Sequence, residues 1–157
     1  MINIILLVAA FLFMEFVAWS NHKYVMHGFL WKWHKDHHIK DKHSIVPQKV
    51  EESRFEKNDL FFLIYAIPAI ILIIVGLGFN VSALVYIGAG ITLYGFTYFV
   101  IHDVIIHKRL NIPFLHKNHS HYIKAVLRAH SAHHWGRNVR DFKNYGLLIF
   151  PKRFFKE

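Results

Sequence analysis

Residues 60–101 read LFFLIYAIPAIILIIVGLGFNVSALVYIGAGITLYGFTYFVI and contain no charged side chain. The run is long enough for two membrane-spanning helices, because each needs roughly 20 predominantly apolar residues. Gly76 and Asn80 supply turn chemistry near its middle. The stretch therefore predicts a tight helical hairpin, with one span at about 60–79 and the next at about 81–101.

A third apolar stretch, at about 2–20, precedes this hairpin and is interrupted only by Glu15. A cleaved signal peptide is the alternative, but a basic n-region is missing and the helical pattern continues into His22. An ionisable side chain inside a span suggests a function. Glu15 lies two helical turns before His22 and on the same face. It is a candidate for orienting a histidine ligand, or else a merely interfacial or paired carboxylate.

All 19 lysines and arginines avoid these apolar stretches, with 8 between residues 22 and 58 and 11 between residues 108 and 157. A nucleic-acid-binding protein places its basic residues on a soluble face instead. The pattern is typical of the positive-inside rule, which puts both basic segments on the cytoplasmic side. We therefore predict an all-α integral membrane protein of the bacterial-type inner membrane, with three to four membrane-embedded helices. Its single domain, 1–157, carries a cytoplasmic His-rich cap formed by residues 22–58 and 102–157.

Histidine is the unusual component of the composition, with 14 residues in a chain of 157. The absence of cysteine excludes disulfides and thiolate metal sites. Ten histidines form two matching sets, each an H-x4-H followed by an H-x2-H-H. On an α-helix the trio spans about 100°, whereas the H-x4-H pair is about 140° apart and flanks a site from two sides. The sets are HKYVMH (22–27) with HKDHH (34–38), and HDVIIH (102–107) with HSAHH (130–134).

Ten convergent imidazoles exceed the four ligands of a structural zinc site and suit two near-octahedral ions. The number and kind of ligands favour iron without excluding zinc or copper. A ferritin-like centre is excluded, because no Glu-x-x-His occurs. The candidate metal ligands are His22, His27, His34, His37, His38, His102, His107, His130, His133 and His134.

The remaining polar and aromatic candidates lie outside this pattern. Asp103, beside His102, and Asp141 could hydrogen-bond a histidine ligand. Trp31, Trp33 and Trp135 are expected in the aromatic belt at the membrane interface. The apolar segment 145–150 is too short to span and is expected to dock there. Incidental surface sequence is the interpretation for His43, His116, His119 and His121.

Four segments together resemble bacterial non-haem di-iron β-carotene hydroxylases of the fatty acid hydroxylase and sterol desaturase superfamily. They are MEFVAWSNHKYVMHGFLWKWHKDHH (14–38), FEKNDLF (55–61), HDVIIHKR (102–109) and AHSAHH (129–134). The resemblance implies a monooxygenase that hydroxylates carbon 3 of a carotenoid β-ionone ring, converting β-carotene through β-cryptoxanthin to zeaxanthin. It also implies two iron ions held by the ten histidines, O2 as co-substrate, and a reduced ferredoxin-type electron donor. The substrate would enter from membrane lipid.

Two other functions remain open at this point. The same chemistry could act on a sterol, a fatty acyl chain or another carotenoid position. A non-catalytic membrane metal-binding protein is disfavoured, because transporters place polar ligands at mid-membrane, whereas these histidines lie just beyond the ends of the spans.

Overall fold

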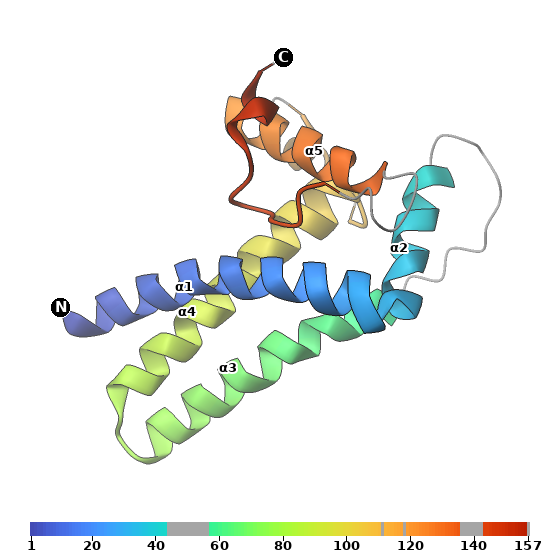
Figure 1. The fold of residues 1–157 in the computed structure, drawn as a ribbon. Helices are drawn as coiled ribbons and strands as arrows, with labels where there is room; N and C mark the ends of the chain where they lie inside the picture. The colour runs from blue at the N-terminus through green and yellow to red at the C-terminus, as the bar shows by residue number, and fades with distance from the viewer. Residues whose placement is uncertain (44–56, 111, 118, 136–142, 157) are drawn as a thin grey trace.

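The computed structural model describes residues 1–43, 57–110, 112–117, 119–135 and 143–156, and the regular structure within them is helical (Figure 1). Five α-helices and five shorter helical segments follow one another along the chain. In order they are α1 (Ile2–Ser20), η1 (Asn21–Phe29), α2 (Trp31–His43), η2 (Lys57–Leu60), α3 (Phe61–Gly78), α4 (Ser82–Tyr98), η3 (Phe99–Ile106), η4 (Pro113–His116), α5 (His121–His134) and η5 (Lys152–Phe155).

Three continuous helical stretches are long and apolar enough to cross a membrane: Ile2–Phe29, Lys57–Gly78 and Ser82–Ile106. They match the three predicted spans except at Phe79 and Val81, which lie in the turn, and each extends at its other end into a polar or histidine-bearing segment. Asn80 has a positive φ of 55° in the turn between α3 and α4. This confirms the all-helical membrane fold and the predicted hairpin.

Helix α4 packs between α1 and α3, and glycines make the close approach possible. A Cβ atom on Gly90 would collide with the backbone carbonyl of Leu7 on α1. One on Gly88 would lie 2.9 Å from the backbone carbonyl of Ala69 on α3. Small residues at such contacts allow membrane helices to approach closely without a hydrophobic driving force between them.

Replacing Gly90 with alanine is therefore expected to lower the stability of the folded protein by about 1–3 kcal/mol, because backbone atoms must move apart. Gly95 lies on the same helix with no atom within 4 Å of its added Cβ, so Gly95→Ala is the matched control. Thermal unfolding in detergent, followed by circular dichroism, measures both variants. Equal midpoints for the two variants would contradict the packing described here.

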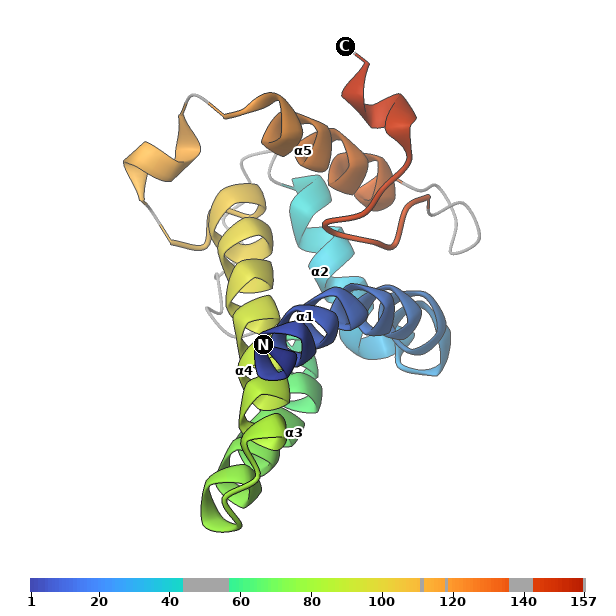
Figure 2. The same ribbon diagram turned by 90° about the vertical axis from the view of Figure 1, so that its left-hand side faces the viewer.

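The histidine-bearing elements gather at the end of the bundle opposite the α3–α4 turn. Helices α2 and α5 and the C-terminal segment lie together there, beside the start of α3 and the end of η3 (Figures 1 and 2). The apolar spans thus deliver both histidine sets to one place.

The C-terminal segment packs inward through two of its leucines. Leu147 is buried with Ile101 and Val126, and Leu148 packs against the cluster that contains Met14 and Tyr94. Ile149 remains 68% exposed. The expected docking at a membrane interface stays a prediction for the exposed side of this segment, and its inner side belongs to the core.

Candidate metal centre

Both H-x4-H motifs lie in or at the end of π-helical segments. His22 and His27 are in η1, His102 is in η3, and His107 is the C-cap of η3. The N–H of His107 donates to the carbonyl of His102 at 3.0 Å, an i→i+5 bond. Since a π-helix bonds residues five apart, each pair lies on one side of its helix rather than about 140° apart as on an α-helix. The prediction that each pair flanks a site from two sides was therefore wrong.

The ring centroids confirm this arrangement, at 5.1 Å for His22 and His27 and 4.5 Å for His102 and His107. Gly28 then breaks the first π-helix with non-helical angles (φ −100°, ψ −122°) before α2 begins at Trp31. The two motifs of the first set therefore lie on two separate helical segments. π-helical segments occur frequently at functional sites.

Nine of the ten motif histidines form two adjoining groups, and each H-x2-H-H trio is divided between them. Around the axis of an α-helix, the first and last histidines of the trio are about 40° apart. The middle histidine in the sequence is displaced from the first by about 60° in the opposite direction. The middle histidine, His37 or His133, therefore joins the group built mainly from the other set. The first cluster is His22, His27, His34, His38 and His133, and the second is His37, His107, His130 and His134.

In the first cluster, five Nε2 atoms converge on one point. Four Nε2–Nε2 distances link them in a chain: 3.1 Å from His22 to His34, 3.0 Å from His34 to His38, 3.2 Å from His38 to His27, and 3.0 Å from His27 to His133. Neighbouring nitrogens on an octahedral ion, with metal–nitrogen bonds of ~2.1 Å, would be ~3.0 Å apart, against ~3.4 Å on a tetrahedral ion. The spacing fits an octahedral ion better.

Hydrogen bonds on the outer sides of two rings fit a cation between their inner nitrogens. His22 Nδ1 donates to the carbonyl of Tyr145 at 3.0 Å, and His34 Nδ1 contacts Asn58 Oδ1 at 2.7 Å. A neutral imidazole protonated at Nδ1 carries a lone pair at Nε2. The two facing Nε2 atoms of His22 and His34 are then both acceptors, and a cation between them would make their 3.1 Å separation favourable.

The second cluster takes His37 from α2, His107 from the C-cap of η3, and His130 and His134 from α5. His107 Nε2 and His130 Nε2 are 3.0 Å apart. His102 is the tenth motif histidine, and its ring packs against those of His37 and His107 at 5.1 and 4.5 Å. The two clusters touch where His38 stacks on His134, with ring centroids 4.3 Å apart.

Burial disfavours the charged form of histidines in both clusters. It lowers the pKa of His34 to about 3, although the hydrogen bond with Asn58 opposes this effect. Burial, followed by repulsion from neighbouring imidazoles, also holds the pKa of His37 and His130 well below the usual value. Desolvation disfavours the charged form. At neutral pH the nitrogen lone pairs are thus available to a metal ion.

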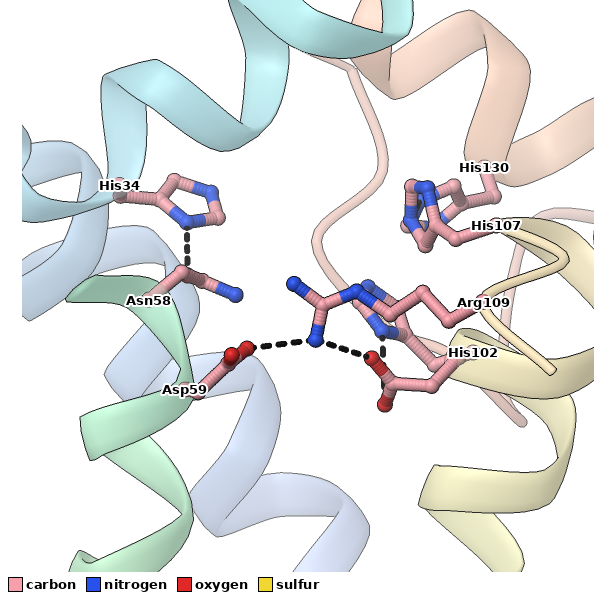
Figure 3. A network of polar contacts seen from close by, with 8 residues as sticks. His34, Asn58, Asp59, His102, His107, Arg109 and His130 are labelled. Atoms are coloured by element: carbon pink, nitrogen blue, oxygen red, sulfur yellow. Dashed lines mark hydrogen bonds and ion pairs between the residues drawn. The ribbon is translucent and has the colours of Figure 1, made fainter. Parts of the chain in front are cut away.

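A polar network connects the surroundings of the two clusters (Figure 3). Asn58 holds His34, and its neighbour Asp59 accepts from Arg109 at 2.6 Å. Arg109 is also 3.2 Å from Asp103, whose other oxygen lies 3.4 Å from His102 Nδ1. Asp103 therefore lies beside a motif histidine, as its place in the sequence suggests. Asn58 and Arg109 were missed, because single polar residues outside a repeat give no signal of their own.

Asn58→Leu should weaken metal binding about 10- to 100-fold, because it removes the acceptor that holds His34 in one orientation. Asn58→Asp keeps an acceptor oxygen and should retain most of the affinity. Asn21→Leu is the control, because Asn21 donates to Tyr65 and not to a histidine. Metal content after dialysis against a weak chelator measures all three, and wild-type retention in Asn58→Leu would contradict the role of Asn58.

The other candidates from the sequence occupy varied positions. Trp31 lies against the rings of His27 and His38 at 5.1 and 5.5 Å, at the first cluster, while Trp33 and Trp135 are exposed. Asp141 lies outside the described residues, as does the side chain of His43.

The described histidines outside the motifs have local partners. His116 Nε2 accepts from the backbone N–H of Ile112, and His121 is exposed against Phe155. His119 is half-buried. None of these three belongs to either cluster in the described part of the chain.

A comparison with protein families adds a second line of evidence. The fatty acid hydroxylase family model matches residues 7–156. The chain belongs to the fatty acid hydroxylase family. Its curated relatives include the β-carotene hydroxylase of Pseudescherichia vulneris, which is 36% identical over 97% of this chain and 79% of the relative. The β-carotene hydroxylase of Paracoccus sp. (strain N81106 / MBIC 01143) is 38% identical over 96% of this chain and 86% of the relative. The β-carotene hydroxylase of Pantoea ananas is 38% identical over 88% and 71%. No solved structure matches this fatty acid hydroxylase.

Proposed function

We propose that this membrane enzyme hydroxylates carbon 3 of a carotenoid β-ionone ring, converting β-carotene through β-cryptoxanthin to zeaxanthin. The observation that carries the proposal is the pair of adjoining, buried, all-nitrogen clusters in a chain similar to β-carotene hydroxylases. Two redox-active ions side by side suit dioxygen chemistry, whereas a structural site needs a single ion with four ligands.

Each cluster would hold one iron ion, with the ten motif histidines as the ligands. When bound, the irons supply the reductive activation of O2 and the removal of a hydrogen atom from the ring carbon. The protein's own contribution is orientation and exclusion of water. Tyr145 contributes through its ring, which lies 5.2 Å from those of His27 and His133, and Trp31 covers the same cluster from α2.

The partners follow from the surroundings of the clusters. The exposed apolar faces of α1 and α3 place the protein in lipid, from which a carotenoid would enter. Lys35, Lys57 and Lys108 are exposed on the segments that carry the clusters. Complementary charge would attract an acidic, reduced ferredoxin-type donor to this surface. We place this surface on the cytoplasmic side of the bacterial-type inner membrane by the positive-inside rule.

Expression of the full chain in a β-carotene-accumulating host tests the proposal, with pigments identified by chromatography. The expected product is zeaxanthin, with β-cryptoxanthin as the intermediate. Unchanged β-carotene in cells that contain the metal-loaded protein would refute it.

The family description makes a fatty acyl chain the second candidate substrate, and analysis of the lipid fraction of the same cells would detect a hydroxylated acyl product. O2 consumption that depends on added iron would exclude a non-catalytic metal-binding protein.

A further inference from the structure

Glu15 is a carboxylate buried inside an apolar helix, and all four of its described hydrogen bonds come from donors outside α1. Its exposed fraction is 5%. The hydroxyl of Tyr94 on α4 donates to Oε2 at 2.7 Å. Oε1 accepts from three consecutive backbone N–H groups, those of Leu147 at 2.9 Å, Leu148 at 2.9 Å and Ile149 at 3.0 Å. Successive N–H groups of this kind form an anion-binding concavity.

The segment 144–149, here called the strap, is shaped around this carboxylate. A Cβ atom on Gly146 would collide with the carbonyl of Ile149 and lie 3.1 Å from Glu15 Oε1. Asn144 has a positive φ of 65°, and its side chain donates to the carbonyl of Gly146 at 3.0 Å. Only glycine fits at position 146 in this conformation. The strap can therefore pack closely around the Glu15 carboxylate only with glycine at this position.

The strap reaches the first cluster through Tyr145. Its carbonyl accepts the hydrogen bond from His22 Nδ1 at 3.0 Å. Its ring lies 5.6 Å from the ring of His22 and 5.2 Å from that of His133. The backbone carbonyl of Tyr145 therefore determines which nitrogen of His22 is protonated.

We propose that Glu15 is a positioning residue for the first cluster, acting through the strap to hold His22 with its Nε2 lone pair directed at the metal ion. The role rests on the proposed metal centre. Glu15 does not touch a histidine ligand in the described contacts. It binds the backbone on one side of Tyr145, and Tyr145 binds His22 on the other.

The physical reason is that a carbonyl only accepts hydrogen bonds. While the carbonyl of Tyr145 stays in place, His22 must carry its proton on Nδ1, which leaves Nε2 free to coordinate. Without the carboxylate, one buried and two partly buried N–H groups lose their acceptor, and leaving a buried donor unsatisfied is costly. The strap would then leave its place, and His22 would lose the partner that selects its tautomer.

Co(II) titration of the detergent-solubilised full chain, followed by visible absorption, tests the inference without requiring hydroxylation. Wild type should bind two equivalents, and His133→Ala identifies the first-cluster signal. Glu15→Leu and Gly146→Ala should each lower the affinity for the Co(II) ion of the first cluster about tenfold or more. The affinity for the second Co(II) ion should not change. Glu15→Gln keeps an acceptor oxygen for the strap and should lie between wild type and Glu15→Leu.

Tyr65→Phe is the matched control, because it removes a tyrosine hydroxyl that accepts a hydrogen bond from Asn21 of η1 and keeps the ring in place. Its affinities should stay within about twofold of wild type. The inference is overturned if Glu15→Leu and Gly146→Ala bind both Co(II) ions with wild-type affinity, or if they lower both affinities together. It is also overturned if Tyr65→Phe lowers the affinity of the first cluster as much as they do.

These outcomes separate the inference from the proposed function. A chain that binds two Co(II) ions with the expected dependence on Glu15, but makes no hydroxylated carotenoid, would retain the positioning role and lose the substrate assignment. A wild type that binds no Co(II) would remove the metal centre itself.

Discussion

His133→Ala should lower carotenoid hydroxylation by at least about 100-fold and remove metal from the first cluster. The side chain is fully buried, and its Nε2 lies 3.0 Å from His27 Nε2. It is also the only α5 residue in that cluster, so no neighbouring histidine of the helix replaces it. Zeaxanthin yield in the carotenoid-producing host and iron content of the purified protein measure the two effects.

His121→Ala is the matched control, since it removes an exposed imidazole from the first residue of the same helix. Its yield and iron content should equal those of wild type. If His133→Ala retained its full metal content and activity, the assignment of the first cluster would fail.

Removal of the metal ions should produce the second large effect, a fall of more than about 10 °C in the midpoint of thermal unfolding. An ion present at a thousand times its dissociation constant stabilises the folded state by about 4 kcal/mol, and here two ions act on a chain of 157 residues. Without them, neutral nitrogens such as those of His22 and His34 face each other at 3.1 Å. Unfolding in detergent, with and without chelator, measures the shift.

The control for this effect is the variant in which both crossing residues, His37 and His133, are alanine. Its midpoint should respond much less to chelator than that of wild type, because each cluster has lost a ligand. An identical response in the two proteins would show that the chelator acts elsewhere.

Continuous apolar runs and a repeated motif are strong signals in a sequence. The apolar run led to a correct prediction of the fold, and the repeated motif picked out histidines that gather in space, whose role as metal ligands stays a prediction. The uncharged residues 60–101 form the α3–α4 hairpin. Nine of the ten motif histidines fall into the two clusters, and the tenth, His102, packs beside the second. Both features depend on composition and spacing alone.

The errors arose where the local backbone or the docking of helices decides the geometry. Angles calculated for an α-helix do not apply to η1 and η3, and no residue type in HKYVMH or HDVIIH marks a π-helix. The division of each trio follows from α-helical geometry, but the assignment of His37 and His133 to opposite clusters depends on how α2 and α5 meet. Three of the four described partners of Glu15 are backbone N–H groups, which every residue except proline possesses and which sequence therefore cannot distinguish.

His37 and His133 each belong to the cluster built mainly from the other histidine set. This arrangement also determines when the two histidine clusters can be completed during biosynthesis. Residues 22–38 emerge from the ribosome long before α5, but they supply only four of the five nitrogens of the first cluster. The fifth arrives with residue 133, and the carbonyl that holds His22 arrives later still, with residue 145. Metal insertion that completes both clusters must therefore follow synthesis of nearly the whole chain, after all three spans have been made.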